Sequence, residues 1–137
     1  MKIDKDLLDN LLAEASKSPR LRMNLDLRTS PDDSSQRMLN ALLPGTKVPI
    51  HRHTKSTETL LLLRGRMEEI YYEVDGESHF VVKETERVTL SVDGDIRGLS
   101  IPVGQWHSLN ILEPTVILEC KDGAYEPLGE EDILMNA

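Results

Sequence analysis

The sequence has little cysteine, few aromatic residues, no long hydrophobic run and less basic than acidic charge. Cys120 is the only cysteine among 137 residues, so no intramolecular disulfide can form, which is typical of a reducing compartment. Aromatic residues make up 4% of the chain, too few for the stacking platforms that bind single-stranded nucleic acid. The longest aliphatic run, residues 60–63, is far shorter than the roughly 20 apolar residues of a transmembrane helix. We therefore expect neither a membrane protein nor a binder of single strands.

Acidic side chains outnumber basic ones by 24 to 16, which gives a formal net charge of −8. Binding to phosphate backbones needs clustered Lys and Arg, so we expect no nucleic-acid partner. The first six residues alternate in charge and contain no apolar stretch that would act as a secretion signal. These features indicate a cytoplasmic protein. With 39% hydrophobic and 29% charged residues, the chain has the composition of one ordinary globular domain.

Residues 4–17 have the only clear helical pattern. Four leucines and an alanine recur at the spacing of one helical face, Asp4 is suited to cap the first turn, and Pro19 ends the pattern. We expect this helix, within residues 1–20, to pack on its own domain; packing on a second subunit is the alternative. Residues 21–125 would form the body of that single domain. The acidic residues 126–137 would follow as a tail over the surface.

From residue 21 onwards the apolar residues follow the alternation of β-strands. Residues 21–27 alternate strictly, and short segments then follow, separated by turn dipeptides such as Pro44-Gly45 and Asp93-Gly94. The later expected strands are residues 37–43, 48–53, 59–64, 67–74, 78–82, 87–92, 97–101, 106–112 and 115–121. Many short strands at this spacing predict an all-β antiparallel sandwich or barrel.

Two histidines, His51 and His53, are separated by one residue in an expected strand. Alternate residues of a strand point to the same face, so the imidazoles would lie side by side, with about 7 Å between their α-carbons. Glu58 follows after a stretch long enough to reverse the chain, and His107 lies in a later segment. Three imidazoles and one carboxylate form a suitable ligand set for one divalent transition metal. Iron, manganese, nickel and zinc all accept such a set.

This spacing resembles the first sequence motif of the cupin superfamily at every position. Read in order, the matching residues are Gly45, His51, His53, Glu58 and Gly65. The core of the second motif is present as Pro102-x-Gly104-x-x-His107, whereas its flanking glycine and asparagine are displaced. The resemblance implies a double-stranded β-helix, or jelly-roll barrel, with a metal held by the three histidines and Glu58.

A narrower similarity covers most of the chain. The leucine-rich N-terminal helix, residues 36–42, the pair Trp106-His107 and residues 119–125 are similar to those of the WbuC-type cupins, although Ala124 stands where that family more often has proline. That family occurs with genes for bacterial surface-polysaccharide synthesis, so the resemblance implies a link to this process. Because barrel cupins commonly pair, the resemblance also implies a homodimer.

Six residues in or beside the expected strands are candidates for substrate binding: Arg37, Asn40, Trp106, Glu119, Lys121 and Tyr125. Half of the strand side chains in a small barrel face its lumen. Alternation does not say which half, because residues 38–43 and 116–120 are apolar on both phases. The alternatives are a packing role for Trp106 and exposed surface positions for the other five. His79, in a charged neighbourhood, is most simply a solvated or hydrogen-bonded residue.

The sequence favours a metal-dependent enzyme that acts on a small polar, sugar-like molecule by isomerase- or oxygenase-type chemistry. The alternative is a binding or sensor module in which the metal anchors a small ligand without turnover. No acid–base residue stands out, so the residues do not decide whether the protein is an enzyme.

Overall fold

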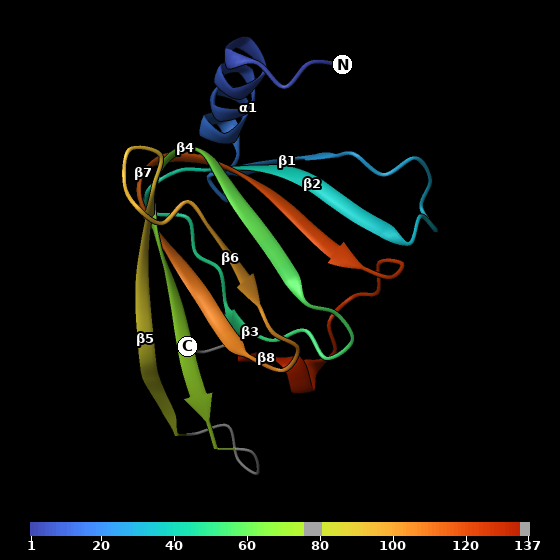
Figure 1. Ribbon diagram of the computed structural model, residues 1–137, viewed down its shortest axis with the longest axis vertical. Coiled ribbons are helices and arrows are strands. Elements are labelled where there is room, and N and C mark those ends of the chain that lie inside the picture. Colours follow the sequence, from blue (N-terminus) through green and yellow to red (C-terminus); the bar gives the residue numbers. More distant parts are fainter. Residues whose placement is uncertain (76–80, 135–137) are drawn as a thin grey trace.

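The computed structural model describes residues 1–75 and 81–134, so His79 lies outside the described residues. One helix, α1 (Lys5–Lys17), stands at one end of an antiparallel sheet (Figure 1). The strands are β1 (Arg22–Asp26), β2 (Ser35–Leu42), β3 (Ile50–His51), β4 (Glu58–Val74), β5 (Val82–Ser91), β6 (Gly98–Ile101), β7 (Trp106–Asp122) and β8 (Ile133–Leu134). Their pairings are antiparallel, and the architecture is the expected all-β jelly roll with an N-terminal helix.

Two long strands, β4 and β7, pair with each other and bend together near their middles. The first half of β4 also pairs with β6 and the second half with β5. Similarly, β7 pairs first with β3 and later with β2. The bend thus divides one continuous sheet into two halves. Gly65 lies at the bend with φ +95°, and a β-carbon there would lie 2.2 Å from the carbonyl oxygen of Pro114, so the site requires glycine.

The sequence predicted separate strands on either side of Gly65, and the structure shows one strand instead. The expected strands 106–112 and 115–121 are likewise a single strand, and β5 runs unbroken through residues 83–86, where a gap was expected. The first two predictions were wrong because glycine and proline mark a change of direction without distinguishing a bend from a chain reversal. The third was wrong because residues 83–86 are polar and exposed, so they lack the apolar alternation of a half-buried strand. The part of the expected strand 78–82 that covers residues 78–80 lies outside the described residues.

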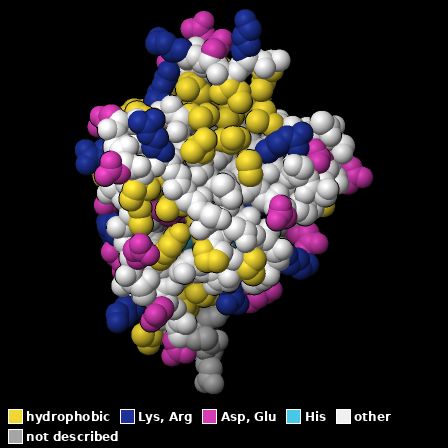
Figure 2. Space-filling view, in the orientation of Figure 1, with side chains coloured by type: hydrophobic (Ala, Val, Ile, Leu, Met, Phe, Trp, Pro, Cys, Tyr) yellow, Lys and Arg dark blue, Asp and Glu magenta, His cyan; other side chains and the backbone are white. Residues whose placement is uncertain are grey.

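Helix α1 packs on the outer face of the half-sheet that contains β1 and β2. Asp4 caps the helix by accepting a hydrogen bond from the Leu7 amide at 3.0 Å, and Leu8 and Leu11 are buried against a group that includes Leu39. Figure 2 shows hydrophobic side chains gathered where the helix meets the sheet. The inner face carries a second core, formed by Leu42, Leu60, Leu62, Met67, Leu90, Ile101, Ile111 and Ile117. Residues 41–42 of β2 and 115–117 of β7 are therefore buried on both faces, which explains the apolar character of these segments on both phases.

Residues 130–134 do not trail over the surface as expected. They form a 3₁₀ helix, η1 (Glu130–Asp132), followed by β8, which pairs with β3. Arg52 Nε donates a hydrogen bond to Asp132 Oδ1 at 2.8 Å and fixes this segment beside the barrel. A strand of two residues has no periodicity that a sequence reading can detect. Among the described residues, no helix combines the length and the hydropathy that crossing a membrane requires.

Candidate metal centre

Three histidines from two neighbouring chain segments meet inside the barrel. The register places His51 of β3 directly opposite His107 of β7, and His53 follows two residues after His51. Each offers a ring nitrogen, and these three nitrogens lie within 4.8 Å of one another. The ring centroids are 4.3 to 5.7 Å apart. The imidazoles therefore surround one small volume.

Backbone carbonyls orient two of the rings. His51 Nδ1 lies 2.8 Å from the Pro49 carbonyl oxygen, and His107 Nδ1 lies 2.9 Å from that of Gln105. A ring that donates through Nδ1 keeps its lone pair on Nε2, the arrangement common among metal-binding histidines. The Nε2 atoms of His53 and His107 are buried and lack a hydrogen-bond partner among the described residues. Because buried polar atoms are rarely left without partners, this donor set fits a metal ion.

Glu58, the first residue of β4, lies beside the rings from the other half of the sheet. Its Oε1 atom is 3.2 Å from His53 Nε2, and its Oε2 atom is 4.0 Å from His107 Nε2. Burial acts to raise the pKa of Glu58, but the close contact with His53 and the charge of Lys121, 3.6 Å away, outweigh it and lower the pKa. Burial is also the main cause that lowers the pKa of His51 to about 4. An ionised carboxylate beside neutral imidazoles is the protonation state that binds a metal.

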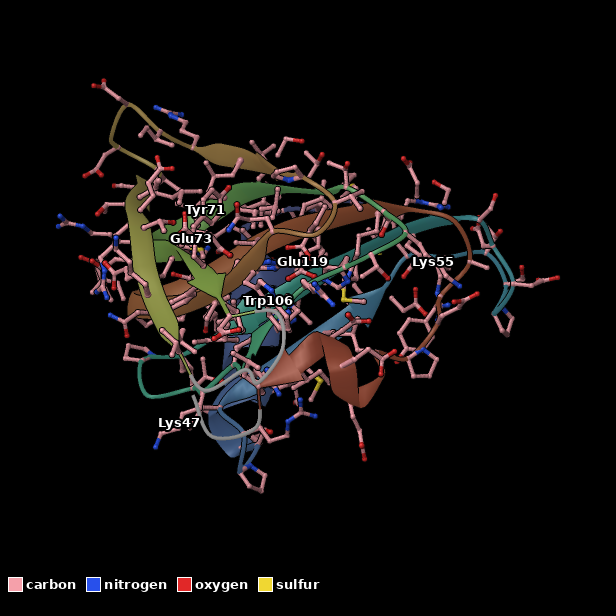
Figure 3. All side chains as sticks on the ribbon, turned by 90° about the horizontal axis from the view of Figure 1, so that it is seen from below. Lys47, Lys55, Tyr71, Glu73, Trp106 and Glu119 are labelled. Carbon is pink, nitrogen blue, oxygen red and sulfur yellow. The ribbon has the colours of Figure 1, made fainter. Side chains whose placement is uncertain are left out.

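Three of the substrate-binding candidates lie on the inner face. Lys121 contacts Glu58, and Asn40 Nδ2 donates a hydrogen bond to Glu119 Oε1 at 3.3 Å. Figure 3, which looks into the barrel from below, shows Glu119 between the layers of strands. Burial and the charge of Glu58 raise the pKa of Glu119 to about 7. A group that titrates near neutrality in the lumen is suited to exchange a proton with a ligand.

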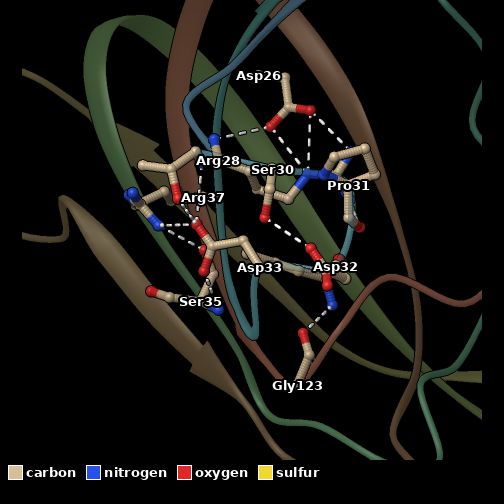
Figure 4. A network of polar contacts seen from close by, with 11 residues as sticks. Asp26, Arg28, Ser30, Pro31, Asp32, Asp33, Ser35, Arg37 and Gly123 are labelled. Carbon is tan, nitrogen blue, oxygen red and sulfur yellow. Dashed lines mark hydrogen bonds and ion pairs between the residues drawn. The ribbon is translucent and has the colours of Figure 1, made fainter.

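Two candidates lie away from the histidines. Arg37 is on the outer phase of β2 and donates hydrogen bonds to Asp33 at 3.1 Å and to the Ser35 carbonyl oxygen at 2.6 Å (Figure 4). These contacts stabilise the loop between β1 and β2. Tyr125 is 57% exposed and lines the mouth of the cleft described below.

Trp106 precedes His107 in β7 and therefore points to the opposite face. It packs with Ile50 and Leu134, and the Arg52 guanidinium lies 4.6 Å from the centre of its ring. The structure thus gives this tryptophan the packing role that the sequence left as the alternative.

Three further residues on the inner face were not singled out from the sequence. Glu69 is 1% exposed, and burial, together with nearby carboxylates, raises its pKa well above the ordinary value. Tyr71 stands opposite His107 across the β4–β7 pair and is labelled in Figure 3. Arg22 lies opposite Leu42, an inner core residue. The alternation in β1 shows that Arg22 belongs to a polar face, but it does not show that this face is the inner one.

A cleft of about 710 Å³ opens beside the histidines. Its walls include Arg22 from β1, His51 and His53, Lys121 from β7, and residues 122–129. The cleft lies between β1 and β8. Among the described residues, these are the first and last strands in the hydrogen-bonded order β1-β2-β7-β3-β8. A small molecule in this cleft would reach the imidazoles directly.

A family model described as a domain of unknown function (DUF6016) matches residues 3–85. The chain belongs to this family. The match includes helix α1, His51, His53 and Glu58, and it ends before His107. No curated protein matches the sequence.

Solved structures share the fold of this DUF6016 chain. KdgF from Halomonas sp. has 17% sequence identity and a TM-score of 0.57, with 79% of this chain and 84% of KdgF covered. Oxalate oxidase in complex with glycolate has 13% identity and a TM-score of 0.61, covering 82% and 56% of the two chains. The capsular polysaccharide assembling protein CapF from Staphylococcus aureus has 19% identity and a TM-score of 0.62, covering 85% and 32%. At these identities the similarity shows the fold, and the chain spans about half of oxalate oxidase and a third of CapF.

Proposed function

We propose that this cupin binds one divalent transition metal through His51, His53 and His107, with Glu58 as the fourth protein ligand. The observation that carries the proposal is the convergence of three imidazoles, two of which have buried Nε2 atoms that form no hydrogen bond with the described residues. Glu58 supports it as an ionised oxygen donor 3.2 Å from His53. Nitrogen and oxygen ligands of this kind suit iron, manganese, nickel or zinc.

We further propose that the protein is an enzyme for a small polar, sugar-like substrate linked to bacterial surface-polysaccharide synthesis. The cleft of about 710 Å³ beside the histidines supports a small-molecule substrate. The WbuC-like sequence features and the structural similarity to CapF, which its name describes as assembling capsular polysaccharide, support the link to polysaccharides. A homodimer and a cytoplasmic location remain parts of this proposal.

In such an enzyme the residues of this chain would have separate roles. The metal, when bound, supplies Lewis-acid polarisation or an open coordination position for substrate or oxygen. Glu119, which Asn40 orients through a hydrogen bond of 3.3 Å, holds or releases a proton near neutral pH. Tyr71, opposite His107, adds a hydroxyl group on the inner face.

Measuring turnover of candidate substrates tests the proposal that the protein is an enzyme. The purified protein, loaded in turn with each of the four metals, is incubated with a panel of sugar nucleotides, and products and dioxygen uptake are measured. The proposal predicts a product that requires metal and is lost in His107→Ala. Stoichiometric ligand binding without any product would contradict the enzymatic proposal and favour the binding or sensor module.

A further inference from the structure

Arg22 brings a permanent positive charge to the cleft without an anionic partner of its own. Its Nε atom is buried and has no hydrogen-bond partner, and its guanidinium forms no ion pair within residues 1–75 and 81–134. Arginine stays ionised in proteins, and buried charges are as a rule paired. An unpaired, half-buried guanidinium that lines a cleft therefore points to an anion supplied by the ligand.

The backbone holds Arg22 in a fixed position. The preceding residue, Leu21, has φ +58°, a left-handed conformation that is rare for leucine. Two contacts maintain it: the Leu43 amide donates to the Leu21 carbonyl at 3.0 Å, and the Thr46 hydroxyl donates to the Arg20 carbonyl at 2.7 Å. Strained positions that the surrounding structure fixes concentrate at functional sites. Here the strained residue directs Arg22 into the inner face at the start of β1.

Two of the four carboxylates that line the cleft are engaged elsewhere, and the other two, Asp122 and Glu131, form no ion pair with Arg22 among the described residues. Glu126 pairs with Lys55 at 2.7 Å, and Asp132 pairs with Arg52 at 2.8 Å. They are therefore not the missing partners of Arg22.

Other polar groups lie closer to the inner end of the cleft. Glu119 is within electrostatic range of both Arg22 and Lys121, yet it hydrogen-bonds to Asn40 and forms no ion pair with Arg22. Lys121 and Arg20 line the same cleft as His51 and add positive potential. The cleft is lined by four basic and four acidic side chains, a balance that the chain as a whole, with its net charge of −8, does not have.

We propose that Arg22 binds the anionic group of the ligand in the cleft, so that the ligand is a small molecule with a carboxylate or a phosphate. This inference rests on the proposed function for the role of the histidines, whereas the arginine subsite itself needs no metal. A guanidinium binds either anion through two parallel hydrogen bonds, which a lysine ammonium cannot do. Arg22 would thus determine specificity for anionic over neutral sugars.

The experiment follows the Nε–Hε NMR signal of Arg22, assigned by its disappearance in Arg22→Gln. The full-length protein, once treated with EDTA and once saturated with zinc, is titrated at constant ionic strength with D-glucuronate, D-glucose and inorganic phosphate. Glucuronate and glucose have the same ring and differ in one group, which is a carboxylate in glucuronate and a hydroxymethyl group in glucose. We expect the Arg22 signal to shift with at least one anion and not with glucose. A response to glucuronate alone identifies a carboxylate ligand, and one to phosphate alone a phosphate ligand.

Variants separate the subsite from general charge effects. Arg22→Gln should weaken binding of the responding anion about tenfold or more, the size of a lost charge-assisted hydrogen bond, and Arg22→Lys should weaken it less. Arg87→Gln is the matched control, because Arg87 pairs with Glu84 on β5 and lies outside the cleft. Circular dichroism checks that each variant is folded.

Three results would overturn the inference: no shift of the Arg22 signal up to 20 mM of either anion, equal binding of glucose, or unchanged anion affinity in both Arg22 variants. Zinc uptake, measured on the same samples, keeps the two proposals apart. Zinc binding without an anion response defeats only the arginine subsite, whereas an anion response with no uptake of zinc, iron, manganese or nickel defeats only the proposed metal centre.

Discussion

Replacing Gly65 with alanine should destabilise the protein strongly, because the bend that joins the two halves of the sheet has no room for a side chain. A β-carbon at this position would lie 2.2 Å from the Pro114 carbonyl oxygen and 2.5 Å from Thr115 Oγ1. Alanine at φ +95° costs about 1–2 kcal/mol in backbone strain, and displacing the neighbouring strand adds about 1–3 kcal/mol. The expected loss in the free energy of unfolding is therefore about 2–5 kcal/mol.

Gly123→Ala provides the matched control. Gly123 also has a positive φ, +83°, but no described atom lies within 4 Å of its added β-carbon, so only the strain of about 1–2 kcal/mol applies. Urea unfolding, followed by the fluorescence of the buried Trp106, measures both variants. Equal losses in the two variants, or a loss below about 0.5 kcal/mol in Gly65→Ala, would refute the account of the bend.

Three further predictions concern the lumen, the helix and the C-terminal segment. Burial raises the pKa of Glu69 above its ordinary 4.5, so its stabilising contribution is full below about pH 4.5 and is lost as the pH rises. In EDTA, Glu69→Gln should therefore gain stability over the wild type as the pH rises above about 4.5, by at most about 1.4 kcal/mol per pH unit. Parallel pH profiles of the two proteins would contradict this. Asp4→Ala removes the cap that accepts the Leu7 amide and should cost about 1 kcal/mol in urea unfolding, whereas no loss would mean that the cap is dispensable. Asp132→Ala removes the partner of Arg52 and should speed amide hydrogen exchange in residues 133–134 while leaving β2 unchanged, and equal acceleration in both would indicate general destabilisation.

Local sequence signals predicted the elements that are determined by residues close to them in the chain. The helix follows from its leucine spacing and from Asp4, and the alternation at residues 21–27 matches β1. The shared face of His51 and His53 follows from the period of a strand. The same signals did not distinguish a bend at Gly65 from a turn, because that depends on the distant Pro114.

The direction in which strand side chains point could not be predicted where both faces are buried. Leu39 packs under helix α1, whereas Asn40, its neighbour, faces Glu119 in the lumen. In most small domains the polar face of a strand meets solvent, but in β1 the apolar residues face the helix and Arg22 faces inward. The short strand β8 depends on pairing with β3, a contact across some 80 residues of chain that no local pattern encodes.

The metal content of the untagged protein, purified without added metal or chelator, tests the central claim most directly. Elemental analysis by plasma mass spectrometry should find about one transition-metal ion per chain. His53→Ala and His107→Ala should each lose it while keeping the circular dichroism of the wild type, because the two hydrophobic cores do not include these residues. The absence of metal in the wild type, together with no uptake on dialysis, or full metal occupancy in either variant, would contradict the proposed metal centre.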